Sequence, residues 1–105
     1  MHTAAWMFIR HGQERRARAI CEALVEDDAR DGVAVAALAG ILLDSGEPGR
    51  ALEILRAADF PPELSHAEAV LETRALKESG RQREGAARWR RYLESRKGGA
   101  RQWIA

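Results

Sequence analysis

The stretch RQREGAARWRRYLESRK, residues 81–97, holds the side chains with the clearest potential for chemistry. Its arginines are interleaved with Trp89 and Tyr92, a pattern that can hold phosphates while aromatic rings stack on bases. At helical spacing, however, Trp89, Tyr92 and Leu93 share one face, and the arginines fall on other faces. We therefore interpret the arginines as a solvated surface. Nucleic-acid binding through this last helix stays the less favoured alternative.

The three histidines are the other residues that could do chemistry. His2, His11 and His66 have no cysteine or carboxylate partner at a spacing typical of a metal site. The glycines recur singly, so they form no phosphate-binding loop, and no serine stands in a nucleophile elbow. We predict that the protein is not an enzyme and that it uses no metal or other cofactor.

Charge and composition limit the remaining classes. With 17 basic and 16 acidic side chains the net charge is +1, which argues against strong nonspecific attraction to nucleic acid or anionic membrane. The single cysteine, Cys21, cannot form an internal disulfide and suits a reducing compartment. No apolar run approaches the roughly 20 residues that span a bilayer. We expect a soluble, cytoplasmic protein with no direct membrane insertion.

The elements that must position these residues follow from a repeat. Gly12, Gly46 and Gly80 are evenly spaced, and their interval matches the length of a tetratricopeptide repeat, about 34 residues. The surrounding chemistry repeats as well, with a large apolar residue four positions before each glycine and a small residue five positions after it. These residues are Phe8, Leu42 and Leu76, and Ala17, Ala51 and Gly85.

The period predicts an all-α fold of three tetratricopeptide-like helical hairpins, stacked as a short right-handed solenoid with a short C-terminal tail. A single domain at 1–97 would contain repeats at about 1–29, 30–62 and 63–97, and residues 98–105 would form the tail. The six expected helices are 3–11, 14–26, 33–44, 47–58, 65–79 and 82–96.

Local residues support these boundaries. Gly12 is expected to end the first helix, Asp31 to cap the third, and Pro48 to sit in the first turn of the fourth. Ser65 and Glu68 have the spacing of a capping box. The pair Gly98 and Gly99 is expected to stop the last helix, after which Trp103 and Ile104 would fold back over the last repeat.

Helical periodicity also predicts which residues are buried. The second helix should bury one stripe, and the last helix should bury a set that is partly aromatic. The expected buried residues are Ala17, Ile20, Cys21, Leu24 and Val25, and Ala86, Trp89, Tyr92 and Leu93.

The predicted partner site is the concave groove that the first helices of such repeats line, where an extended or helical peptide is captured. Its apolar part lies toward the N-terminus and its basic part toward the C-terminus, which suits an apolar segment that carries some acid. The predicted groove residues are Trp6, Ile9, Arg10, Val33, Ala36, Gly40, Leu43, Asp44, Val70, Arg74 and Lys77.

Three segments together resemble a known family. AAWMFIRHGQERRARAICEALVEDD, LAGILLDSGEPGRALEIL and LETRALKESGRQREGAARWRRYLESRKGG are similar to the small tetratricopeptide chaperones of bacterial type III secretion, the SctY (YscY) class. Trp6 matches the family's N-terminal aromatic residue and Ala17 its small repeat residue. Tyr92, Leu93 and Glu94 match its closing YLE, whereas Trp89 stands where a tyrosine is more usual.

The resemblance implies a non-enzymatic cytoplasmic chaperone. It would hold a small export-apparatus protein, the SctX-like partner, as a heterodimer and present it to the export gate. Two alternatives of similar architecture stay open: another type III secretion chaperone, for needle or translocator subunits, and a generic tetratricopeptide adaptor.

Overall fold

The computed structural model describes the backbone of residues 2–104 and the side chains of residues 12–97. The described chain is all-α, as predicted, and contains no strand beyond an isolated bridge between Asp31 and Asp59. Its helices are α1 (His2–Asp27), α2 (Gly32–Asp44), α3 (Pro48–Ala57), the short 3₁₀ helix η1 (Pro62–Leu64), α4 (Ser65–Glu78) and α5 (Gln82–Ile104).

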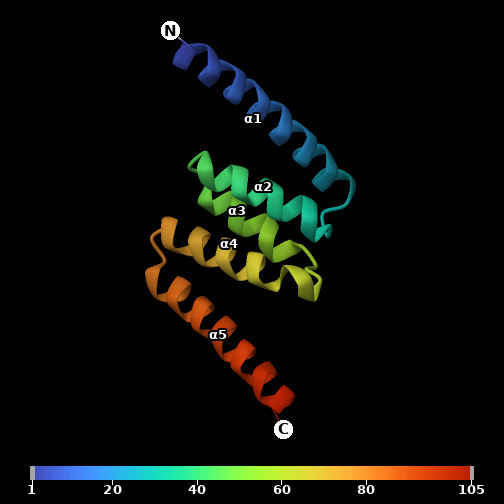
Figure 1. The fold of residues 1–105 in the computed structure, drawn as a ribbon, viewed down its shortest axis with the longest axis vertical. Coiled ribbons are helices and arrows are strands. Elements are labelled where there is room, and N and C mark those ends of the chain that lie inside the picture. Colours follow the sequence, from blue (N-terminus) through green and yellow to red (C-terminus); the bar gives the residue numbers. More distant parts are fainter. Residues whose placement is uncertain (1, 105) are drawn as a thin grey trace.

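The helices follow one another along the long axis of the molecule (Figure 1). α1 lies at one end and α5 at the other, and the molecule measures 58 × 30 × 25 Å. α2 packs against α1, α3 and α4, and α4 packs in addition against α3 and α5. The middle three helices therefore have neighbours on several sides, whereas α1 and α5 each pack mainly against one other helix.

The core is centred on α2. Val35, Leu38 and Leu42 are almost completely buried there, and they meet Leu52 and Leu55 of α3. The sequence of α2, GVAVAALAGILLD, has no charged residue before Asp44. Such a helix is stable only when other helices surround it, which is how this one is packed. Asp31 caps its start, since its carboxylate accepts hydrogen bonds from the backbone N–H of Val33 (3.1 Å) and Ala34 (3.3 Å), as predicted.

Two glycines close the hairpins α2–α3 and α4–α5 with the same set of hydrogen bonds. Gly46 (φ 76°) and Gly80 (φ 81°) adopt the left-handed conformation that favours glycine. After them, the backbone N–H of Glu47 donates to the Leu42 carbonyl and that of Arg81 to the Leu76 carbonyl, both at 2.8 Å. This is the Schellman motif. The chain therefore makes the same turn at both glycines, one sequence period apart.

Gly12 does not form a third turn of this kind, so the predicted helix break is wrong. α1 runs through it from His2 to Asp27, and Gly12 is not among the glycines with positive φ. A glycine inside a helix costs only about 1 kcal/mol relative to alanine, and it keeps the helical hydrogen bonds on both sides. Pro48 follows Gly46, but no proline follows Gly80 or Gly12, so a proline is not what separates the turns from the continued helix.

Two further boundaries differ from expectation. α5 continues through Gly98 and Gly99 to Ile104, so this glycine pair does not stop the helix. The same modest glycine penalty applies, and no proline follows. At the start of α4 the capping residue is Leu64, and Ser65 makes no capping hydrogen bond because it already lies inside the helix. The predicted return of Trp103 and Ile104 concerns side chains outside the described part.

The end helices bury less than the periodicity predicts. In α1, Cys21 and Val25 pack against the core, but Ala17, Ile20 and Leu24 are exposed. In α5, Gly85 is buried, Trp89 and Tyr92 are half-buried, and Ala86 and Leu93 are exposed. The reason is shared, because each of these helices has a neighbour on one side only.

Glycine substitutions test this assignment of turns. We expect Gly46→Ala and Gly80→Ala each to lower the free energy of unfolding by about 1–2 kcal/mol, because alanine is strained at positive φ. Gly12→Ala should instead raise it by about 0.5–1 kcal/mol, since Gly12 is a helix-interior residue with open space around its Cβ position. Urea unfolding followed by circular dichroism measures all three, and a destabilising Gly12→Ala would indicate a turn at that residue.

Candidate protein-binding surface

The outer face of α2 contributes part of the predicted groove. Val33 is 66 % exposed, and Ala36 and Gly40 are half-buried on the same side of the helix. A Cβ added at Gly40 would meet no atom within 4 Å, so the surface is open at this point. This part of the predicted site therefore lies at the surface and is apolar.

The outer face of α4 continues this surface through Val70, Arg74 and Lys77, all exposed. Arg74 connects the two helices, because its Nη2 lies 3.2 Å from Oδ1 of Asp44 at the end of α2. The hydrogen bond from Arg74 to Asp44, followed by the one to Glu78, raises the pKa of Arg74. The structure thus brings together two predicted groove residues that lie 30 positions apart.

This ion pair also changes the expected charge of the groove. Arg74 is shared between Asp44 and Glu78, so its charge is already balanced. Among the described side chains of the predicted groove, Lys77 is the one charged group with no ion pair. The basic character predicted for this end is therefore concentrated at one side chain.

Leu43 does not belong to this surface. Its side chain is 3 % exposed and lies in the core cluster with Leu42 and Leu38, so a partner cannot contact it. Because α2 is apolar on nearly all sides, its sequence does not indicate which of its residues face inward. Trp6, Ile9 and Arg10 are part of the α1 backbone, and their side chains lie outside the described part.

A hollow of about 460 Å³ lies beside Val70, between α4 and α5. Its lining residues are Val70, Thr73, Arg74, Lys77, Glu78 and Trp89. Thr73 is 8 % exposed, and its hydroxyl has no hydrogen-bond partner within the described structure. Buried polar atoms usually have partners, but this oxygen exposes less than 1 Å² of surface, so a bound segment does not reach it without rearrangement of the side chains around it. Sequence reasoning identifies three of these six residues and misses Thr73, Glu78 and Trp89.

A second hollow of about 270 Å³ lies on the other side of Asp44, between α1 and α2. It is lined by Glu14, Arg15, Arg18, Ile41, Asp44 and Ser45. The ion pair between Asp44 and Arg74 therefore lies between two depressions. Together with the outer faces of α2 and α4 they form a surface to which four helices contribute.

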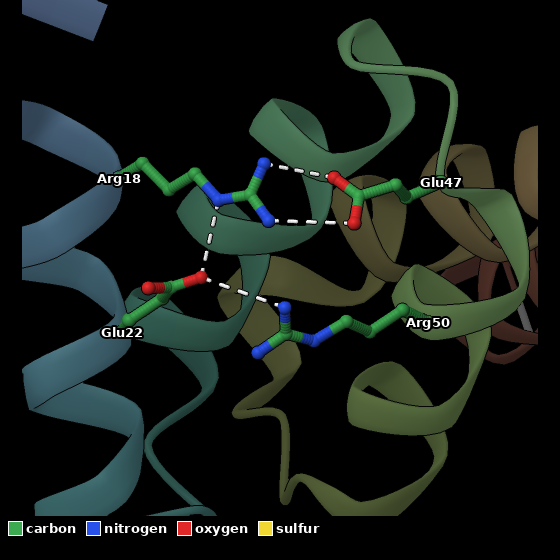
Figure 2. A network of polar contacts seen from close by, with 4 residues as sticks. All are labelled: Arg18, Glu22, Glu47 and Arg50. Carbon is green, nitrogen blue, oxygen red and sulfur yellow. Dashed lines mark hydrogen bonds and ion pairs between the residues drawn. The ribbon is translucent and has the colours of Figure 1, made fainter. Parts of the chain in front are cut away.

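A network of charged side chains fixes α1 against the start of α3 (Figure 2). The Arg18 guanidinium donates two hydrogen bonds to the Glu47 carboxylate, at 2.8 and 3.4 Å, and a third to Glu22 at 3.1 Å. Arg50 lies 3.6 Å from the same Glu22 oxygen. The hydrogen bond from Arg18 lowers the pKa of Glu47, and the bonds to Glu47 and Glu22 raise the pKa of Arg18.

The basic stretch of α5 is partly occupied by contacts within the protein. Arg88 lies 3.5 Å from Glu68 and 3.3 Å from Glu72, and burial raises the pKa of Glu68. The rings of Trp89 and Tyr92 lie 5.3 Å apart and both lie close to His66. The aromatic rings that would stack on bases are thus packed against each other and against α4.

The described residues contain no group of three or more histidine, cysteine, aspartate or glutamate side chains that could hold a metal ion. Within the same part of the chain, no helix is both long enough and apolar enough to cross a membrane. The described part of this surface combines exposed apolar residues with a few charged ones, which are the means of binding a polypeptide segment.

The chain matches no family model, no curated protein and no solved structure. The resemblance to type III secretion chaperones therefore rests on the sequence segments that carry it.

Acid should weaken the attachment of α1 through Glu47. The pKa of Glu47 in the folded protein lies below its ordinary value of 4.5, so its contribution to stability is complete at neutral pH and is lost as the pH falls below about 4.5. We expect Glu47→Gln to lower the melting temperature at pH 7, and the difference from the native chain to shrink in acid.

The matched control is Glu53→Gln, since Glu53 is exposed on the same helix and forms no ion pair with a described residue. Melting curves recorded by circular dichroism from pH 7 to pH 3 give the comparison. If the melting temperatures of Glu47→Gln and the native chain differed by the same amount at every pH, the ionised Glu47 carboxylate would not be what stabilises the contact with Arg18.

Proposed function

We propose that this protein is a non-enzymatic, helical-repeat protein that captures a segment of another protein on the outer faces of α2 and α4. The observation that carries the proposal is that these faces keep Val33 and Val70 exposed, with Val70 beside a hollow between α4 and α5. Exposed apolar residues beside a hollow are typical of binding surfaces. The preferred ligand is an apolar segment with an acidic group placed to meet Lys77.

The architecture that we propose is a short right-handed solenoid of tetratricopeptide-like hairpins. Two findings support it: the matching turns at Gly46 and Gly80, and the contacts of α2 with both α3 and α4. α1 then takes the position of the second helix of the first repeat, since Ala17 stands one repeat length before Ala51. In such an array the helices equivalent to α2 and α4 form the ligand-binding face.

The particular role that we propose is that of a cytoplasmic chaperone of type III secretion, of the SctY class. Its partner would be a small SctX-like export-apparatus protein, held as a heterodimer and presented to the export gate. The quoted sequence segments support this role, and the mixed apolar and charged surface fits a protein ligand. Needle or translocator subunits are the alternative cargo, and a generic adaptor is the alternative class.

Charge placed on the outer faces should abolish capture without unfolding the protein. We expect the double variant Val33→Glu with Val70→Glu to lose its partner, because two carboxylates would then stand in the apolar contact. Both positions are exposed, so the free energy of unfolding should change by no more than about 0.5 kcal/mol per site. Ala57→Glu is the control, since it adds a carboxylate at an exposed position of α3, away from the outer faces of α2 and α4.

The measurement is affinity purification of the tagged chain from its native host, with co-purifying proteins identified by mass spectrometry. Recovery of a small export-apparatus protein near one to one, retained by Ala57→Glu and lost by the double variant, is the expected result. A needle or translocator subunit would redirect the role to that cargo. Capture that the double variant leaves unchanged would place the binding surface elsewhere.

A further inference from the structure

The outer face of α1 is an apolar stripe with a charge at each end. Arg16, Ala17, Ile20, Leu24 and Asp27 are all exposed, and their spacing places them on one side of the helix. Ile20 is 61 % exposed and Leu24 is 49 % exposed. Neither Arg16 nor Asp27 forms an ion pair with a described residue. The stripe lies away from Val25, which packs against the core.

Ala17, at the edge of this stripe, is exposed, whereas the residues at the equivalent position of the other two sequence repeats are buried. Ala51 and Gly85, which follow Ala17 at successive repeat lengths, are both buried. A Cβ at Gly85 would lie 2.9 Å from Cγ of Lys77 and 3.2 Å from the Thr73 carbonyl oxygen, so α4 lies directly on α5 there. α1 has no such cover over Ala17, because residues 2–11 extend α1 instead of folding back along it. Ala17 is therefore exposed at a position that a neighbouring helix covers at Gly85.

The order of residues along the stripe identifies its occupant. A positive residue stands at one end, a negative residue at the other, and two aliphatic residues lie between them. When two copies of this stripe run antiparallel, Ile20 meets Leu24 of the second copy, and Arg16 comes within reach of Asp27 of the second copy. Both pairings are centred near residue 22, and at about 1.5 Å per residue the two centres agree to within about 1 Å. The face is therefore complementary to itself.

We propose that α1 mediates a symmetric homodimer, in which two α1 helices pack antiparallel through this stripe around a two-fold axis near residue 22. Each copy uses the same residues, so the contact closes after two chains and leaves no free stripe for a third. The dimer contact lies on α1, apart from the outer faces of α2 and α4. It is independent of the proposed function and leaves that surface open.

A charge-exchange experiment on the full chain tests the pairing. Light scattering coupled to gel filtration should give twice the chain mass of 11.7 kDa. Arg16→Asp alone and Asp27→Arg alone should each weaken dimerisation by about tenfold, because each places like charges opposite one another in both contacts. The double variant Arg16→Asp with Asp27→Arg should restore the native dissociation constant, since it re-forms both pairs with reversed sign.

Two apolar variants complete the design. Ile20→Glu should give a monomer with native helical content, because Ile20 is exposed within one chain. Leu93→Glu is the matched control, since Leu93 is 40 % exposed on α5, and it should leave the dimer intact. A monomeric native chain overturns the proposal. In that case, loss of partner capture by Ile20→Glu would assign the stripe to a helix of the partner, and retained capture would leave it without a protein ligand.

Two other results would also overturn the proposal. A mass that keeps rising with concentration would indicate head-to-tail contacts rather than a closed pair. A dimer that the double charge exchange does not restore would lie on another surface or in another register.

Discussion

The packing of α2 is the constraint on which the rest of the structure depends. Its residues are apolar on nearly all sides, so it has no face that can be left in water at low cost. α1, α3 and α4 surround it, and Ala34 and Ala39 are small enough to allow their close approach. Once these helices are in place, the faces left over include the outer sides of α1, α3 and α5 and the edge where α2 and α4 lie side by side. The candidate surfaces are thus what remains after α2 is covered.

α1 and α5 each pack against a helix on one side only, and different side chains hold them in place. α5 uses long side chains, with Arg88 held between Glu68 and Glu72 and with aromatic rings packed on His66. α1 is held by Cys21 and Val25 and by the charged network around Arg18, all on its inner side. Its outer side keeps aliphatic residues that have nothing to cover them. Ile20 and Leu24 of α1 thus join Val33, Val70 and Leu93 as the large exposed aliphatic residues of the described part.

Parts of this structure could be predicted from local sequence, and these are the parts with local causes. Gly46 ends α2 in a left-handed turn, and Asp31 caps α2 through backbone N–H groups two and three residues away. Gly12 and Gly80 have the same spacing and neither is followed by a proline, yet Gly80 forms a turn and Gly12 does not, so local sequence does not decide whether the chain turns. The pairs Arg18–Glu47 and Asp44–Arg74 join helices that are distant in the sequence, and no local pattern indicates them. The repeat frame places Leu43 on the wrong side because a helix without a polar face gives no periodic pattern from which to orient it.

Three positions one sequence period apart, Ala17, Ala51 and Gly85, carry a small residue, yet the structure does not use them in the same way. At Ala51 and Gly85 the small side chain allows a second helix to approach closely, and the contact is buried. Ala17 is also small enough for a second helix to approach closely, but it is exposed and no helix of the same chain covers it. In a linear stack each helix is stabilised by its neighbours, and an end helix with an uncovered apolar face therefore gains the most from a further neighbour. Since the stripe on α1 is mainly aliphatic and the face of α2 and α4 is mixed and partly charged, the proposed homodimer and the proposed capture of a protein segment rely on different contacts.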